Sequence, residues 1–451
     1  MSSFPQRVLV ANRGEIARRV IATTRRLGIE SVAVYHPIDA ALPFVSEADR
    51  AVPLEGEAPV KAYLDGPQII RLALSVGATA VHPGYGFLAE NAQFAQDVAD
   101  AGLVWIGPPA DAIRTMGDKV QARRAVSAVG VPVSGGAADA LASVDDAVAE
   151  AGRIGYPVMV KASEGGGGIG MAVAHDEAAL RKAFAGTQSM AERSFGSSRV
   201  FVERFVSTAR HVEVQILGLA DGSVIVLGER DCSVQRRHQK LVEESPAPAL
   251  DASTRERMLR CAVKAAEVVN YVNAGTVEFL LDTATGQFVF LEMNTRIQVE
   301  HPVTELALGV DLVEQQLSIA QTGTTAPGFE PVLRGHAIEV RVCAEDPRRF
   351  FPSPGVIDTW KEPEGAGIRV DAGYAAGLEV TPFFDPLLAK VCAFGDSRDE
   401  ALARVRRALD DFEITGVVTN LPFLRDLLRS EAFTTGHYDT SIVANMKSKQ
   451  P

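Results

Sequence analysis

The chain has few cysteines and no long hydrophobic run. Its 451 residues include four widely spaced cysteines, Cys232, Cys261, Cys343 and Cys392, and no CxxC pair. A disulfide framework and a thiolate metal site are therefore not expected, and reduced, packed thiols are. No apolar run approaches the ~20 residues that span a bilayer, and residues 1–10 lack the apolar core of a signal peptide. We therefore expect a cytoplasmic protein with no membrane partner.

The chain also lacks a surplus of positive charge. Its 57 acidic residues outnumber 45 lysines and arginines, which gives a formal net charge of −12. Binding to a phosphate backbone normally needs clustered positive charge, so nucleic acid is not an expected partner. One basic run, RRHQK at 236–240, stands out against this acidic background. A solvated surface is the simpler interpretation of this run, but its place between a strand-like segment and a proline-rich loop favours a local anion site.

Residues 6–106 alternate short apolar runs with amphipathic stretches. Strands are predicted at 8–10, 32–35, 78–81 and 103–106, and helices at 17–27, 68–76 and 91–101. This alternation is typical of βαβ units around a parallel sheet, so we expect a doubly wound α/β domain. A dinucleotide-binding Rossmann domain would look similar. However, the first strand-to-helix turn, ANRGE at 11–15, lacks the GxGxxG spacing that admits a pyrophosphate.

The length and 47% hydrophobic content of the chain predict roughly three domains rather than one core. The composition changes at 131–136, and residues 143–204 then form a compact pattern of helices and strands around a run of glycines. Beyond residue 205, alternating segments such as 211–217 and 223–228 indicate strands. We expect an α/β N-terminal domain, a small flexible central domain and a mixed α+β C-terminal part.

A strand, a glycine run and a second strand follow one another in the central part. YPVMVK at 156–161 precedes GGGG at 165–168, and MAVA at 171–174 follows. Consecutive glycines leave backbone N–H groups free to approach a phosphate chain while the loop opens and closes, and Lys161 supplies a positive charge. A flexible hairpin turn is the alternative, but it would need fewer glycines. We predict nucleotide binding, although no Gly-Lys-Ser/Thr of a Walker motif is present.

Two strand-like segments, 274–281 and 287–294, carry acidic residues that a hairpin would bring together. A three-residue loop at 284–286 would pair Glu278 with Glu292. Alternation then places Asn294 on the same face as Glu292. Opposed carboxylates repel unless a cation lies between them, and oxygen ligands without His or Cys suit Mg²⁺. The alternative is a solvated sheet face on which Lys or Arg neighbours neutralise the acids.

Arg296, Gln298 and Glu300 follow the second strand and alternate with apolar residues. In an extended segment all three side chains would project to one side, beside the predicted metal site. Arg296 and Glu300 could form a simple salt bridge. Beside phosphate and metal, however, a guanidinium can bind a planar, carboxylate-like anion bidentately, and a carboxylate can act as a base.

Several motifs of the chain are long and nearly unbroken. They are ANRGEIA at 11–17, HPGYGFLAEN at 82–91, MGDK at 116–119, ERDCSVQRRHQK at 229–240, EMNTRIQVEHP at 292–302 and AEDP at 344–347. Together they resemble the biotin carboxylases of acetyl-CoA and propionyl-CoA carboxylases over nearly the whole chain. The resemblance implies an ATP-grasp fold. Its parts would be an N-terminal α/β domain at 1–115, a mobile glycine-loop lid at 131–204, an ATP-grasp core at 205–330 and a C-terminal domain at 331–447.

The same resemblance implies roles for individual residues. ATP would contact Lys119, Lys161, Gly167, Gly168, Glu203, Arg204, Phe205, Val206, His211, Gln235, His238, Glu278 and Glu292. Mg²⁺ or Mn²⁺ would be held by Glu278, Glu292 and Asn294, and bicarbonate by Lys240, Arg296, Gln298 and Val299. Biotin would lie near Tyr85 and Arg341. The catalytic group would be Lys240, Arg296, Glu300 as the base, and Arg341, which would stabilise the biotin enolate.

The resemblance further implies the reaction and its partners. Deprotonated bicarbonate would attack the γ-phosphate of ATP to give carboxyphosphate, which breaks down to CO₂ and phosphate; phosphate would take the ureido proton of biotin, and the enolate would capture CO₂. No biotin-accepting Ala-Met-Lys-Met segment occurs, so we expect biotin on a separate carboxyl carrier protein. The carboxyltransferase subunit would be a further partner, and a homodimer is implied as well.

The chain departs from the family pattern in the glycine loop. Many members have Arg or Lys at the position of Ile169 and Arg at that of Ala172. These departures concern lid electrostatics and the choice of subfamily. Three alternatives to the implied function stay open. They are a biotin carboxylase for another acceptor such as urea or pyruvate, a different ATP-grasp ligase, and a non-catalytic regulatory subunit.

Overall fold

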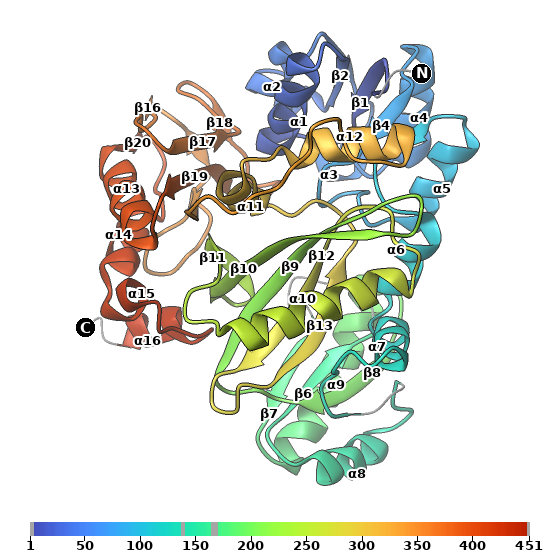
Figure 1. Ribbon diagram of the computed structural model, residues 1–451, viewed down its shortest axis with the longest axis vertical. Coiled ribbons are helices and arrows are strands. Elements are labelled where there is room, and N and C mark those ends of the chain that lie inside the picture. Colours follow the sequence, from blue (N-terminus) through green and yellow to red (C-terminus); the bar gives the residue numbers. More distant parts are fainter. Residues whose placement is uncertain (1–3, 137–139, 164–169, 449–451) are drawn as a thin grey trace.

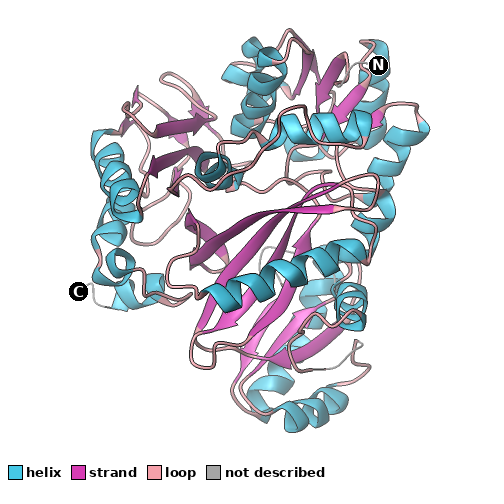
Figure 2. Cartoon of the chain, viewed as in Figure 1, coloured by secondary structure: helices cyan, strands magenta, loops and turns pink. Residues whose placement is uncertain are grey.

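The computed structural model describes residues 4–136, 140–163 and 170–448, and its N-terminal part is a parallel sheet with helices on both faces (Figures 1 and 2). The strands β1 (Arg7–Val10), β2 (Glu30–Tyr35), β3 (Arg50–Pro53), β4 (Ala80–His82) and β5 (Val104–Trp105) lie in the order β3-β2-β1-β4-β5. Every neighbouring pair is parallel. The helices include α1 (Gly14–Arg26), α2 (Pro43–Glu47), α3 (Pro59–Ala62), α4 (Gly66–Ser75) and α5 (Ala92–Asp100). The predicted doubly wound domain is confirmed.

Burial on both faces explains why these strands read as continuous apolar runs. Val8 and Val10 of β1 belong to one hydrophobic cluster, together with Ile16 and Val20 of α1. Leu9, between them, points to the opposite face and belongs to a second cluster, which includes residues of α4. Alternate side chains of β1 enter two different cores, so Val8, Leu9 and Val10 are all apolar.

A small antiparallel sheet forms the central part, drawn at the bottom of Figure 1. Strands β6 (Val158–Ala162), β7 (Met171–Ala174) and β8 (Val200–Arg204) lie in the order β7-β6-β8, with α8 (Val144–Ile154) and α9 (Glu177–Phe195) against them. Helices α6 (Ala110–Gly117) and α7 (Lys119–Ala128) lead into it. Lys161 pairs with Met171, as the predicted strand-loop-strand requires. The glycines at 165–168 and Ile169 lie outside the described residues.

A large antiparallel sheet runs through the rest of the chain, on both sides of residue 330. Its strands are β9 (Ala209–Gly218), β10 (Val224–Arg236), β11 (Gln239–Ser245), β12 (Asn273–Asp282), β13 (Phe288–Asn294), β14 (His336–Cys343), β17 (Ile368–Ala372) and β19 (Leu387–Gly395). Their order is β13-β12-β9-β10-β11-β14-β19-β17. Hydrogen bonds between β11 and β14 therefore join strands that precede and follow residue 330, so one sheet continues into the C-terminal part.

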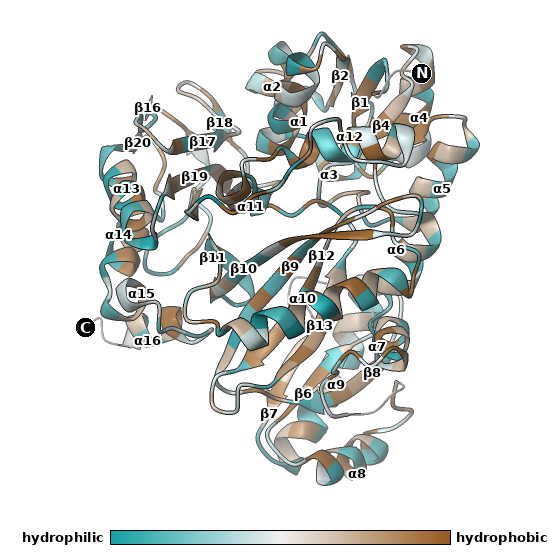
Figure 3. Cartoon of the chain, in the orientation of Figure 1, coloured by the Kyte–Doolittle hydropathy of each residue, from teal (hydrophilic) through white to brown (hydrophobic). Residues whose placement is uncertain are grey.

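Helices cover this sheet, and short strands complete the C-terminal part. The helices are α10 (Ala252–Glu267), α11 (His301–Leu308), α12 (Leu312–Thr322), α13 (Arg398–Asp411), α14 (Leu421–Arg429), α15 (Glu431–Thr435) and α16 (Ile442–Ser448). The short pairs are β15 (Gly355–Val356) with β18 (Glu379–Val380), and β16 (Thr359–Lys361) with β20 (Glu413–Thr415). Hydrophilic and hydrophobic residues alternate along α10, as Figure 3 shows, because only one face of this helix packs on the sheet.

Two expectations from composition can be compared with the structure. All four cysteines are free, and Cys232, Cys343 and Cys392 are buried, which confirms the packed thiols. Among the described residues, no helix is both long enough and apolar enough to cross a membrane.

Candidate active site

The predicted carboxylate pair is present on the β12–β13 hairpin. Glu278 lies opposite Glu292. The predicted three-residue loop is wrong, because the Asp282 N–H donates to the Gln287 carbonyl at 2.8 Å, which leaves the loop at 283–286. A register shift next to Glu278 compensates: Leu291 is an extra residue on β13, as in a β-bulge. The two errors cancel, so the carboxylates meet as predicted.

Each carboxylate of this pair has its own cationic neighbours. The Lys240 Nζ lies 2.9 Å from Glu278 Oε1, and the His211 Nε2 lies 2.8 Å from Glu278 Oε2. The Lys119 Nζ lies 3.2 Å from Glu292 Oε2. Burial alone would raise the pKa of Glu278, but Lys240 and His211 lower it strongly. Cationic neighbours, which the alternative to a metal site required, are therefore present beside both acids. They also keep Glu278 ionised, which is the form that can bind a metal.

Lys240 is the electrostatic centre of the site. Its ammonium lies 2.6 Å from Glu213, 2.9 Å from Glu278 and 2.6 Å from Glu300. Burial alone would lower the pKa of Lys240. The neighbouring Cys232 and the carboxylates of Glu213, Glu278 and Glu300 raise this pKa well above its ordinary value. One permanent cation thus balances carboxylates from three different segments, and an anion that enters the site can compete with them for it.

The segment after β13 reaches this centre by a different route from the one predicted. It is extended only as far as Asn294; a bend follows at Arg296, and a turn at Val299 and Glu300 leads into α11. The side chains nevertheless meet, because the Arg296 Nη1 donates to Gln298 Oε1 at 2.7 Å and the Gln298 Nε2 donates to Glu278 at 3.0 Å. The prediction of a common site holds, whereas that of a straight strand is wrong.

Glu300 lies between two cations. Its Oε1 is 2.6 Å from the Lys240 Nζ, its Oε2 is 2.9 Å from the Arg341 Nη2, and its side chain is fully buried. Burial would raise the pKa of Glu300, but Lys240 and Arg341 hold it well below its usual range. Glu300 is therefore a carboxylate that can accept a proton once its positive surroundings are offset.

The predicted nucleotide residues gather where the small sheet meets the large one. The Glu203 carboxylate contacts the Lys161 ammonium and lies 3.1 Å from the Arg123 Nη1. Burial lowers the pKa of His238, and the nearby charges of Lys161 and His211 lower it further. These three groups therefore lie around one space. Gln235 contacts the His211 ring at 3.2 Å.

Other predicted residues lie at the edge of this space or outside the described chain. Arg204 ends β8 with an exposed side chain, and Phe205 and Val206 follow it, half-buried. The predicted phosphate-binding residues Gly167 and Gly168 lie outside the described residues.

A buried lysine connects the segment predicted to bind bicarbonate to Glu15, which contacts Tyr85. The Lys390 Nζ donates to the Val299 carbonyl at 2.9 Å and lies 3.0 Å from Glu15 Oε2. The other oxygen of Glu15 accepts a hydrogen bond from the Tyr85 hydroxyl. Burial and Glu15 raise the pKa of Tyr85 well above its usual value, and the nearby charge of Arg341 opposes this shift. Arg341 is thus near enough to Tyr85 for its charge to act on the phenol, and their common role at biotin stays a prediction.

Sequence reasoning missed residues that support the site. Glu213 is fully buried. Its carboxylate lies 2.6 Å from the Lys240 Nζ through one oxygen and 2.6 Å from the Arg230 Nε through the other. Glu90 lies 2.9 Å from the Arg296 Nε. The alternation of His211, Glu213 and Gln215 along an otherwise apolar strand was a signal that could have revealed Glu213.

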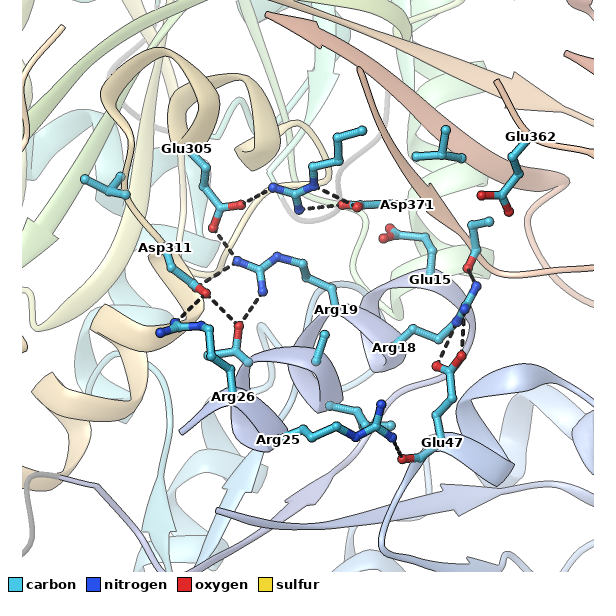
Figure 4. Close-up of a pocket in the computed structure, with 17 residues that line it drawn as sticks. Glu15, Arg18, Arg19, Arg25, Arg26, Glu47, Glu305, Asp311, Glu362 and Asp371 are labelled. Carbon is cyan, nitrogen blue, oxygen red and sulfur yellow. Dashed lines mark hydrogen bonds and ion pairs between the residues drawn. The ribbon is translucent and has the colours of Figure 1, made fainter. Parts of the chain in front are cut away.

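A second charged region adjoins this site through Glu15, which also lines it. A cleft of about 540 Å³ beside α1 is lined by matched ion pairs, shown in Figure 4. Arg19 lies 2.6 Å from Glu305 and 2.7 Å from Asp311, and Arg369 lies 2.7 Å from Asp371. None of the site residues predicted from the sequence is among the described residues that line this cleft.

A carboxylate hairpin on a large antiparallel sheet, with Lys240 and Lys119 beside its acids and a separate small three-stranded sheet, is the arrangement of the ATP-grasp ligases. A family model described as the carbamoyl-phosphate synthase L chain, ATP binding domain, matches residues 118–326. The models for the biotin carboxylase N-terminal and C-terminal domains match residues 4–113 and 339–445.

Relatives narrow this class. A biotin carboxylase of Halalkalibacterium halodurans is 49% identical, over 98% of this chain and 97% of the relative. A pyruvate carboxylase subunit of Methanothermobacter thermautotrophicus is 46% identical, over 97% and 89%. The biotin carboxylase domain dimer of Hydrogenobacter thermophilus 2-oxoglutarate carboxylase, solved with MgADP, ADP and bicarbonate, has a TM-score of 0.95 at 42% identity and 98% coverage of both chains. The chain belongs to the biotin carboxylase family, and it is an ATP-dependent ligase.

Proposed function

We propose that the chain carboxylates biotin on a separate carrier protein, with ATP and bicarbonate, as the first half-reaction of an acetyl-CoA or propionyl-CoA type carboxylase. The observation that carries this proposal is the position of Lys240, which touches both Glu278 of the predicted metal pair and the predicted base Glu300. Nucleotide and bicarbonate chemistry would therefore share one centre. A different ATP-grasp ligase would not need Arg341 beside the same base.

The residues present fit Mg²⁺ or Mn²⁺. Glu278, Glu292 and Asn294 offer oxygen atoms without sulfur or imidazole nitrogen, which suits a hard cation. Such an ion would neutralise phosphate charge when bound. Lys119 and Lys161, at the two sides of the site, would hold ATP phosphates and orient them toward bicarbonate, since phosphoryl transfer depends mainly on positioning and on neutralising charge.

Arg296, Lys240, Gln298 and the Val299 backbone would bind bicarbonate, and Glu300 would take its proton. The anion competes with Glu300 for Lys240, so its arrival offsets the charge that holds the pKa of Glu300 low. The proton then moves to a Glu300 oxygen, and the deprotonated bicarbonate attacks the γ-phosphate, whose bond to the β-phosphate oxygen breaks so that ADP leaves. The resulting carboxyphosphate gives CO₂ and phosphate, phosphate takes the ureido proton, and Arg341 stabilises the biotin enolate that captures CO₂.

The final acceptor and the partners belong to this proposal too. We infer a biotin carboxyl carrier protein and a carboxyltransferase as partners because biotin must travel between two active sites. The dimer of the Hydrogenobacter neighbour supports a homodimer. A second candidate is a biotin carboxylase for pyruvate, which the Methanothermobacter relative favours.

Labelled bicarbonate tests the proposed reaction. The purified chain, with Mg²⁺, ATP and free biotin, is expected to hydrolyse ATP in a bicarbonate-dependent manner and to place the label in carboxybiotin. Omission of biotin should slow hydrolysis, and omission of Mg²⁺ should stop it. Hydrolysis that neither bicarbonate nor biotin affects would instead indicate another ATP-grasp reaction, whereas nucleotide binding without turnover would support a regulatory role.

The metal assignment predicts a separate effect. Glu292→Gln keeps the size of the side chain but removes one anionic ligand, so about tenfold more Mg²⁺ should be needed for half-maximal ATP binding. Titration calorimetry at several Mg²⁺ concentrations measures this. Glu267→Gln, at an exposed position on α10, is the matched control. An unchanged Mg²⁺ requirement in Glu292→Gln would remove Glu292 from the ligand set.

A further inference from the structure

Two buried glutamates behind the site have no part in the proposed reaction. Glu243 on β11 lies directly opposite Glu339 on β14, and both side chains are fully buried. Directly opposed like charges destabilise a sheet, and burial adds to that cost. An arrangement of this kind needs a compensating role or a shared proton.

Arg341 lies on the same strand as Glu339 and contacts Glu243. Its Nη2 is 2.7 Å from Glu243 Oε1 and 2.9 Å from Glu300 Oε2. A single nitrogen of the guanidinium is therefore shared by two carboxylates. One of them is the predicted base, and the other lies deeper in the sheet.

The two opposed glutamates differ in their neighbours: Glu243 forms the ion pair with Arg341, although neither of its oxygens has a partner in hydrogen-bond geometry among the described residues. The Glu339 Oε2 accepts from the Cys392 thiol at 3.4 Å, and within the described chain its Oε1 has no hydrogen-bond partner. Burial raises the pKa of Glu339 well above its usual range, although Lys390 opposes this shift. Its surroundings therefore favour the neutral form of Glu339, whereas Glu243 has the Arg341 guanidinium beside it and is the carboxylate of the pair that is better placed to ionise.

Burial raises the pKa of Glu243 to about 7, with Arg341 acting in the opposite direction. Glu300 and Glu213 also favour the neutral form, and Lys240 favours the ionised one. Together with Glu339 across the strand pair, these are the charged and titratable groups that face Glu243. Its ionisation state therefore changes within the range in which an enzyme of this kind is assayed.

We propose that Glu243 is a positioning residue, which holds the Arg341 guanidinium in place when Glu300 takes up a proton and loses its attraction for Arg341. This inference rests on the proposed function. Neutralisation of Glu300 would otherwise release Arg341 at the stage at which biotin needs it. With Glu243 as a second anchor on the same nitrogen, the guanidinium keeps one carboxylate partner throughout the reaction.

Glu243→Gln tests this role because it removes the charge and keeps the shape. We expect the KM for free biotin to rise about ten- to hundredfold, as for the loss of one charge-assisted contact, while the KM for ATP stays within about twofold. Glu339→Gln is the matched control, since it makes the same change in the same strand pair at a carboxyl that forms no ion pair with Arg341 among the described residues, and its KM for biotin should stay close to that of the wild type. An unchanged KM for biotin in Glu243→Gln would overturn the proposal.

The pH profile separates positioning from a merely structural effect and does not depend on the folding of any variant. In the wild type, kcat/KM for biotin should rise through about pH 7 as Glu243 ionises. Glu243→Asp should retain this step, and Glu243→Gln should lose it. A wild type that carboxylates biotin without such a step contradicts the role of Glu243 alone. A wild type that forms no carboxybiotin contradicts the proposed function instead.

Discussion

Replacement of Lys240 by Met is expected to abolish bicarbonate-dependent turnover and to destabilise the fold by about 3–5 kcal/mol, as for a buried charge cluster that loses one partner. The ammonium lies within 2.9 Å of Glu213, Glu278 and Glu300, and no other lysine or arginine among the described residues touches all three. Methionine fills a similar volume, so the effect reports on charge rather than on a cavity. Removal of this one cation leaves an excess of buried negative charge.

The loss of stability in Lys240→Met should depend on pH. Without the ammonium, burial raises the pKa of these carboxyls above their values in the unfolded chain. Groups with a raised folded-state pKa stabilise the fold at low pH and lose that contribution as the pH rises. The difference between variant and wild type in denaturant unfolding should therefore be larger at pH 8 than at pH 5. Lys264→Met, at an exposed position on α10, is the control, and equal losses at both pH values would contradict the argument.

Glu300→Gln is expected to lower bicarbonate-dependent turnover about a thousandfold, within the usual range for the loss of a general base. The amide has the size of the carboxylate but cannot take the proton of bicarbonate. Arg341 keeps Glu243 as a partner, and Lys240 keeps Glu213 and Glu278, so the site should remain folded.

The measurement for Glu300→Gln is the rate of ATP hydrolysis with and without bicarbonate, together with ATP affinity. Affinity for ATP should stay within about twofold of the wild type, because the change removes transition-state rather than nucleotide contacts. Glu305→Gln is unsuitable as a control, since Glu305 balances Arg19 and Arg369. Glu314→Gln, near the surface on α12, is the better one. Undiminished turnover in Glu300→Gln would show that another group takes the proton.

Local patterns in the sequence predicted much of the fold. The strands and helices predicted within residues 6–106 follow from apolar runs and amphipathic periods. Both patterns can be recognised because each is complete within a short stretch of the chain. The carboxylate hairpin was also accessible, although its loop was not. A loop one residue longer and a bulge at Leu291 changed the register twice, and only the structure shows that the two changes cancel.

The site was only partly predictable from local patterns. The roles of Lys240, Glu300 and Arg341 were suggested by family resemblance, whereas their contacts arise because β11 pairs with β14 and α11 begins beside both. Glu213 and Glu243 were missed, since the partners of each are distant in the sequence. No short-range spacing shows that Glu243 faces Arg341.

The sequence by itself determined the type of the longer elements and the alternation of side chains along their strands, because both depend on repeats of two and 3.6 residues. The tertiary structure alone decided which faces meet. Pairing of β11 with β14 carries one sheet across residue 330 and brings Arg341 to Glu300 and Glu243. Strand order decides these contacts because it joins residues that are far apart in the sequence, and no short repeat predicts such pairs. The buried charges of these residues are balanced only once the sheet has formed.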